Sequence, residues 1–177
     1  MGLPPDGALL GMISRTADHG QIQAMSDTRP FYERKTLSEM SVSEWESLCD
    51  GCGKCCVVIL GDEDDPDTFW RTNVGCKLLD LNTIRCSDYA NRQSKVPGCV
   101  RLSADNIAQL KWMPETCAYR LLYEGQDLPD WHPLKTGDPQ SVIAAGHSVK
   151  GTLISENIVD EDDLEHHIVA RQDAKPE

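Results

Sequence analysis

Four cysteines within eight residues are the feature of this sequence with the clearest chemistry. Cys49, Cys52, Cys55 and Cys56 are separated by two, two and no residues. Two-residue spacers let a tight turn direct successive sulfurs to one centre, and thiolate sulfur is a ligand of zinc and of iron–sulfur clusters. The string therefore predicts a cysteine-ligated iron or zinc centre, and an iron–sulfur cluster is one form that it could take.

The residues between these cysteines suit metal binding. Gly51 and Gly53 can adopt positive φ angles and leave backbone amides free to donate to sulfur. An unperturbed thiol has a pKa of about 8.5, so metal binding must expel protons, and cations such as Lys54 and Lys77 would help. For Lys54 itself, a solvated lysine in a turn is favoured over a role beside the ligands.

The adjacent pair Cys55 and Cys56 cannot easily point both sulfurs at one tetrahedral ion from extended or helical backbone. The pair therefore indicates two nearby metals, or one ligand and one thiol just outside the ligand set. The count permits one or two four-thiolate sites. A ferredoxin fold is disfavoured, because its fourth Cys-Pro ligand is absent. The candidate ligands are Cys49, Cys52, Cys55, Cys56, Cys76, Cys86, Cys99 and Cys117.

Isolated cysteines are more often small buried apolar residues than ligands, and for Cys117 the two interpretations are equally supported. Among the histidines, His132 precedes a proline in a predicted turn, where a hydrogen-bonded turn residue is favoured over a zinc ligand. His147, His166 and His167 are weaker candidates. The acidic run 62–67 lacks the ligand order of a calcium loop, so a solvated loop is expected.

Length and charge exclude several classes of protein. The 177 residues suit one compact domain with tails, and the formal charge of −12 disfavours nucleic acid as a partner. No apolar run is long enough to span a membrane, and no basic, apolar secretory signal opens the chain. The expected location is the cytoplasm, where cysteines are held as thiols, so their spacing indicates metal ligation instead of disulfides.

The predicted elements that would position the site are mostly helices. Capping residues and apolar spacing predict helices over 36–48, 104–112, 115–123 and 160–171, and apolar composition predicts strands over 57–60 and 148–154. The expected fold is a mainly α, irregular, metal-stabilised single domain with a small β element. Its predicted limits are 25–155. Residues 1–24 are expected to be a disordered leader, and Met25 is an alternative start of the protein. A C-terminal helix and tail are expected at 156–177.

Downstream of the four-cysteine string come Cys76, then Cys86-Ser-Asp-Tyr89 with Arg92, and then Cys99. This order resembles the YkgJ-type CxxCxxCC cysteine-cluster family, described as a zinc- or iron-chelating domain. Segments 45–53, 116–122 and 127–134 are similar to its bacterial YcgN branch, over residues 31–149. The resemblance implies cysteine ligation of a metal and carries no reaction with it.

Three functions follow as hypotheses. The first is a binding protein that stores, senses or delivers iron or zinc, with a metal ion as its partner. The alternative is an iron–sulfur or iron-dependent redox or group-transfer enzyme, or an accessory protein of one, because similar clusters occur in larger proteins resembling protein-lysine methylases. The third is a purely structural zinc. No catalytic residue, phosphate-binding glycine loop or serine-hydrolase elbow is identified.

Overall fold

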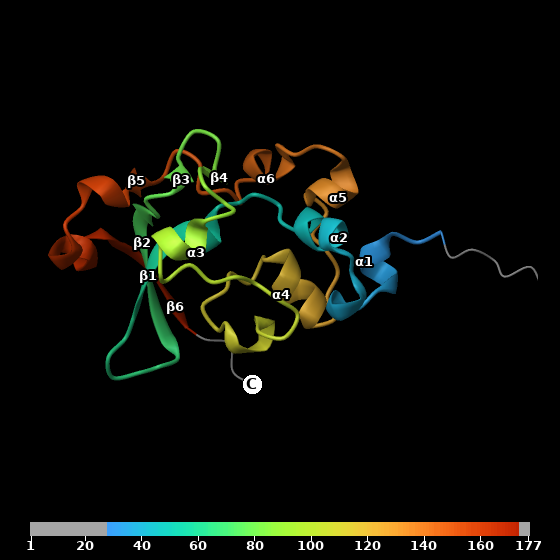
Figure 1. Cartoon of the computed structure of the whole chain (residues 1–177), viewed down its shortest axis with the longest axis horizontal. Helices are drawn as coiled ribbons and strands as arrows, with labels where there is room; N and C mark the ends of the chain where they lie inside the picture. Colours follow the sequence, from blue (N-terminus) through green and yellow to red (C-terminus); the bar gives the residue numbers. More distant parts are fainter. Residues whose placement is uncertain (1–27, 174–177) are drawn as a thin grey trace, which may run out of the picture.

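The chain folds into a helical part and a β-sheet part on either side of the cysteine-rich loop 49–56 (Figure 1). The computed structural model describes residues 28–173. Of the described residues, about a third are helical, 3₁₀ turns included, and about a sixth lie in strands. The expectation of a mainly α fold with a small β element is therefore wrong, and the fold is a mixed one. It differs because several predicted helices shorten to 3₁₀ turns and because the segments Thr68–Gly75 and Ile168–Asp173 pair as strands.

Short helices form the helical part, and capping side chains define where they begin. Thr36 and Glu39 form a capping box at a 3₁₀ turn, Leu37–Glu39. Extended backbone at Met40 then interrupts the helix that was predicted over 36–48. A second capping box, between Ser41 and Glu44, begins the next helix. The α-helices of this part are α1 (Phe31–Arg34), α2 (Val42–Ser47), α4 (Ala118–Tyr123), α5 (Pro133–Thr136) and α6 (Ser141–Ala144).

A hydrophobic cluster holds the helical part together. Leu48, Met113 and Leu128 are almost fully buried in it. The ring of Tyr119 packs against Trp45 with centroids 4.7 Å apart, and its hydroxyl donates a 2.9 Å hydrogen bond to the Trp45 carbonyl. This contact joins α4 to α2, and so it fixes the start of the cysteine loop relative to α4.

Strand β2 (Thr68–Gly75) is the centre of the sheet. Strand β1 (Val57–Gly61) pairs antiparallel along one edge, and its position confirms the strand predicted over 57–60. Strands β6 (Ile168–Asp173) and β5 (Ile154–Ser155) pair along the other edge, antiparallel and parallel respectively. Buried Thr72 of β2 donates a 2.7 Å hydrogen bond to the Val58 carbonyl and so adds a side-chain link between β2 and β1.

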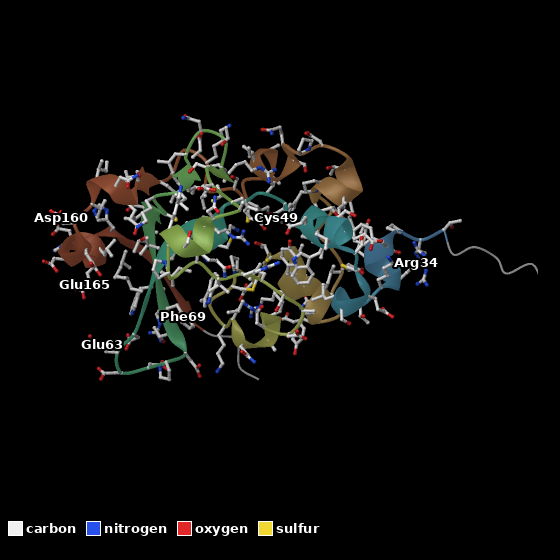
Figure 2. The ribbon with its side chains drawn as sticks, in the orientation of Figure 1. Arg34, Cys49, Glu63, Phe69, Asp160 and Glu165 are labelled. Atoms are coloured by element: carbon white, nitrogen blue, oxygen red, sulfur yellow. The ribbon has the colours of Figure 1, made fainter. Side chains whose placement is uncertain are left out.

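The acidic run forms the loop between β1 and β2, at the tip marked by Glu63 (Figure 2). One carboxylate oxygen of Asp62 accepts the backbone N–H groups of Asp64 and Asp65 at 3.0 and 3.2 Å. Its other oxygen accepts the Trp70 indole N–H at 3.1 Å. The carboxylate therefore stabilises a turn, in agreement with the solvated loop expected here.

Two predictions for the last part of the chain are wrong. The helix expected over 160–171 is a 3₁₀ segment, Glu161–His167, followed by β6, because the β-branched Ile168 and Val169 lie along the open edge of β2. Of the strand expected over 148–154, only Ile154 lies in a strand, as the first residue of β5. The limits 25–155 and 156–177 stay predictions, and the leader and Met25 lie outside the described residues.

The middle segment is irregular and carries three of the cysteines. A small antiparallel pair, β3 (Leu79–Asp80) and β4 (Arg85–Cys86), is followed by α3 (Arg92–Lys95). The helix expected over 104–112 reduces to a 3₁₀ turn, Ile107–Gln109, whereas α4 lies within the predicted segment 115–123. In residues 28–173 no helix is both long and apolar enough to cross a bilayer.

The imidazole of His132 links α5 to the residue before the first cysteine. It is fully buried, its Nε2 lies 3.1 Å from the Leu48 carbonyl and its Nδ1 accepts the Leu134 N–H at 3.1 Å. Because Nδ1 accepts, the proton is on Nε2, which donates to Leu48. Burial lowers the pKa of His132, which keeps the ring neutral.

Replacement of this imidazole tests its role. In His132→Asn the amide oxygen can still cap α5, but the Leu48 carbonyl loses its partner, so we expect a loss of about 1–3 kcal/mol in the free energy of unfolding, measured with urea. His147→Asn, which removes a ring stacked on Trp131, is the control and should cost less.

The lowered pKa of His132 also predicts how stability depends on pH. As the pH falls, His132 takes up a proton in the unfolded chain at a higher pH than in the folded chain. Between about pH 7 and 5 the free energy of unfolding should therefore fall more for the wild type than for His132→Asn.

Candidate metal centre

The loop 49–56 reverses direction twice between α2 and β1. Leu48 ends α2 in the helical core, and buried Asp50 then accepts the N–H of Cys52 at 2.9 Å. Gly51 and Gly53 both have left-handed backbone, with φ of 75° and 78°. The carbonyl of Cys52 accepts the N–H of Val149 at 2.9 Å, which ties the loop to a distant segment.

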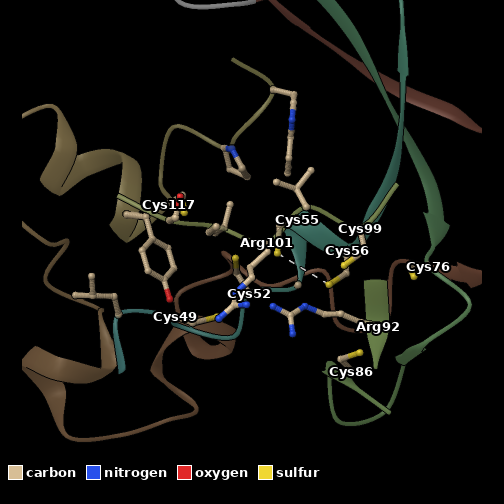
Figure 3. Close-up of a pocket in the computed structure, with 18 of the residues that line it drawn as sticks. Cys49, Cys52, Cys55, Cys56, Cys76, Cys86, Arg92, Cys99, Arg101 and Cys117 are labelled. Atoms are coloured by element: carbon tan, nitrogen blue, oxygen red, sulfur yellow. Dashed lines mark hydrogen bonds between the residues drawn. The ribbon is translucent and has the colours of Figure 1, made fainter. Parts of the chain in front are cut away.

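All eight cysteines line one cavity of about 940 Å³ between the helical part and the sheet (Figure 3). Four come from the loop 49–56. Cys76 follows the end of β2, and Cys86 is the last residue of β4. Cys99 lies in the segment after α3, and Cys117 lies at the N-terminus of α4. The structure thus brings together every cysteine that the sequence analysis selected.

The thiols surround the cavity without forming a closed ligand sphere. All eight are free, and the sulfurs of Cys55 and Cys56 are 4.0 Å apart. Among the described residues, no three cysteine, histidine or acidic side chains are already placed to hold one ion. Metal binding at this cavity would therefore draw the sulfurs inward by side-chain rotation.

The surroundings of four of these thiols, those of Cys49, Cys52, Cys55 and Cys117, keep them protonated at neutral pH. The pKa of Cys49 is raised to about 11, mainly by desolvation and to a smaller extent by the nearby charge of Cys55. Desolvation raises the pKa of Cys117 to about 12. The pKa of Cys52 is also raised, first by burial and then by the charge of Asp50. The pKa of Cys55 is raised by its contact with Cys56 and by burial. A thiolate here needs a compensating cation.

Backbone amides oppose these shifts in the pattern expected of thiolate ligands. The N–H groups of Gly51, Lys54 and Leu78 lower the pKa of the cysteine two residues earlier, at positions 49, 52 and 76. The N–H groups of Tyr119 and Arg120 do the same for Cys117. Amide donors aimed at sulfur stabilise the anionic form and orient it. The donor set therefore fits a thiophilic metal.

A buried carboxylate oxygen lies in the wall of the same cavity. Asp50 is 7% exposed, and its second oxygen has no hydrogen-bond partner among the described residues. An unpaired buried oxygen is costly unless a proton or a cation lies nearby. Its place beside the thiols is a second observation that fits a cation in this cavity.

None of the described histidines adds to the thiol set. His132 uses both ring nitrogens in backbone hydrogen bonds, so the turn interpretation of this residue is confirmed. His147 is stacked on Trp131. His166 lies 3.7 Å from Asp163, and His167 is hydrogen bonded to Asn73 at 3.0 Å, both away from the cavity.

Cationic side chains at the site were largely missed by the sequence analysis. Arg92 and Arg101 line the cavity (Figure 3), and the Arg85 guanidinium packs over Gly51. Arg92 also lies over the Tyr89 ring, 3.7 Å from its centroid. Lys54 donates to the Thr116 hydroxyl at 3.2 Å, so it is not a freely solvated side chain. The sequence feature that could have identified Arg101 as a residue of the site is its position two residues after Cys99.

Residues 48–118 match the family model CxxCxxCC, described as "Putative zinc- or iron-chelating domain". The chain is 55% identical over 148 residues to a UPF0260 protein of Rhizorhabdus wittichii, covering 84% of this chain and 99% of the relative. The chain belongs to the UPF0260 family. The match to the CxxCxxCC model confirms the resemblance to that cysteine-cluster family.

Other UPF0260 relatives are nearly as similar. A protein of Ectopseudomonas mendocina is 52% identical over 82% of this chain and 97% of its own. One of Rhizobium leguminosarum bv. trifolii is 54% identical over 79% of this chain and 87% of its own. No solved structure matches the chain. UPF0260 names describe no reaction, so the role of the family has to be argued from the cavity.

Gly53 is the position in the loop that tolerates a side chain least. A Cβ there would collide with the Ile84 side chain and lie 2.7 Å from a Val149 methyl, at a positive φ. We expect Gly53→Ala to lower the free energy of unfolding by more than about 2 kcal/mol, because left-handed strain and overpacking add.

Gly125→Ala is the matched control for this change. Gly125 has φ of 70°, but no atom lies within 4 Å of the point that a Cβ would occupy. Its cost should be the backbone strain alone, about 1–2 kcal/mol. Equal losses for the two variants in urea unfolding would show that the Gly53 contact carries no stability.

Proposed function

We propose that this protein is a metal-binding protein that holds iron or zinc through thiolates of the eight cysteines. The observation that carries the proposal is the convergence of all eight cysteines on one cavity from five separate places in the chain. Amide groups directed at four of the sulfurs and a partnerless buried carboxylate oxygen among the described residues support it.

The surroundings of the cavity indicate a role in holding or transferring the metal. Free thiols require a reducing compartment, so we propose the cytoplasm as the location. A net charge of −12 makes nucleic acid an unfavourable partner. A thiolate ligand exchanges its metal with an incoming thiol only when the incoming thiol can reach the ligand. Cys49 and Cys55 are exposed to the cavity, so an incoming thiol could reach them there.

The second candidate is an iron–sulfur or iron-dependent redox or group-transfer function, alone or as an accessory protein. The size and lining of the cavity favour it. Its volume of about 940 Å³ is at the upper end of the range typical of small-molecule sites. Apolar residues such as Leu102 and Trp112 line it together with Arg92 and Arg101. A cavity of this size has room for a metal centre together with a small molecule, and the two arginines would favour an anionic one.

Metal analysis of protein purified without oxygen separates these functions. We expect stoichiometric metal. Iron with acid-labile sulfide and a brown chromophore would favour the second candidate. Zinc in a colourless protein would favour a holding or structural role. Protein without bound metal that also takes up neither zinc nor ferrous iron would overturn the proposal.

Metal uptake should release protons, because raised pKa values leave the thiols of Cys49, Cys52, Cys55, Cys76 and Cys117 protonated at pH 7. Each divalent ion that binds four thiols gives a dianionic complex and about four protons. We expect this count when zinc is titrated into metal-free protein at pH 7 in two buffers of different ionisation enthalpy. Affinity should rise with pH toward 11, the pKa region of Cys49. Release of less than one proton per zinc would exclude thiol ligation.

A further inference from the structure

The sulfurs of the adjacent Cys55 and Cys56 are in contact, 4.0 Å apart. In Figure 3 the eight cysteines form two groups, one around each of these sulfurs. The helix-side group is Cys49, Cys52, Cys55 and Cys117, and the sheet-side group is Cys56, Cys76, Cys86 and Cys99.

Strand pairing assembles the sheet-side group. The N–H of Cys76 donates to the Cys56 carbonyl at 2.8 Å, as a continuation of the β1–β2 ladder. Cys86 lies opposite Leu79 in the β3–β4 pair, which follows Cys76 directly. Cys99 enters from the segment after α3. Backbone pairing therefore holds Cys56, Cys76 and Cys86 together independently of the helical part.

Turns and helix packing assemble the helix-side group. The left-handed residues Gly51 and Gly53 bend the chain so that Cys49, Cys52 and Cys55 lie on one side of the loop. Cys117 joins them from the N-terminus of α4. This helix is fixed to the start of the loop by the contact of its tyrosine with α2.

Each group rests on a different hydrophobic cluster. Cys117 packs against the cluster of the helical part, which contains Leu48 and Met113. Cys56 and Cys76 pack against a second cluster, made of Val57, Leu79, Ile84 and Val149. Two separate supports of this kind allow each group to close around its own ion without distorting the other.

Two arginine side chains, Arg92 and Arg101, line the cavity beside the thiols. In Figure 3, Arg92 extends into the space between the two groups, and Arg101 lies beside Cys52 and Cys49 of the helix-side group. Two divalent ions with eight thiolates carry a net negative charge, which these guanidinium groups would partly neutralise.

We propose that the protein has two separate four-thiolate centres, one in each group, placed next to each other by the Cys55–Cys56 peptide bond. This proposal rests on the proposed metal-binding function and divides the ligands that it uses. Each centre would take one divalent, thiophilic ion in tetrahedral coordination, and each ion would displace four thiol protons.

The test is the zinc content of variants that remove one ligand from either group. Wild-type protein reconstituted without oxygen should bind two zinc ions per chain. Cys117→Ser and Cys99→Ser should each retain one tight ion, and the double variant none. Ser103→Ala, a change in the cavity wall outside both groups, should retain two. Cobalt reconstitution gives a second readout, because each tetrahedral thiolate centre adds its own visible absorption, which should halve in either single variant.

The outcomes separate the two proposals. Two ions in wild type but none in either single variant would mean one shared cluster, and two ions in Cys117→Ser would mean that Cys117 is not a ligand. Either result overturns the division and leaves the metal-binding function standing. A wild-type chain that binds one ion also overturns the division. No binding at all overturns the metal-binding function itself. Where a single variant fails to fold, Cys49→Ser and Cys86→Ser replace it and carry the same expectations.

Discussion

The packing of Gly53 against Ile84 and Val149 is the contact on which the rest of the structure depends. It brings the cysteine loop, the β3–β4 pair and the segment after α6 to within van der Waals distance at one point. The hydrogen bond from Val149 to the Cys52 carbonyl lies beside it. Only a residue without a side chain fits there, and only glycine adopts the required φ without strain. The loop can then leave the helical core and enter β1 with its thiols facing the cavity.

The balance between burial and charge explains why so many thiols can share one cavity. Without metal the thiols are neutral, and burying them costs little. With metal the thiolates are stabilised by the ion, by backbone N–H groups and by nearby arginines. The free energy of structural zinc binding is about 10–16 kcal/mol, similar to the total stability of about 5–15 kcal/mol of a typical domain. Metal binding at this cavity would therefore be coupled to folding.

The sequence predicted which cysteines come together better than it predicted the fold. The cysteine spacing and glycines identified the loop 49–56, because ligand chemistry is local in the sequence. Strand β2 was missed even though Thr68, Phe69, Trp70, Thr72 and Val74 have strand-forming side chains. Strand β6 was taken for a helix, since nothing local reveals that Ile168 pairs with Thr72. Arg101 could not be placed at the cavity, because its position depends on irregular backbone that has no sequence period. The domain limits and the ligand roles of the individual cysteines are not tested by the fold.

The hydrogen bond between Val149 and Cys52 joins residues almost one hundred positions apart, and this separation has a consequence for synthesis of the protein. All eight cysteines lie between positions 49 and 117, so they leave the ribosome before the segment that covers Gly53. During that interval the nascent chain presents its thiols on a loop that has not yet been closed. A growing chain can therefore meet metal, or an oxidant, at a stage when the finished cavity does not yet protect its ligands.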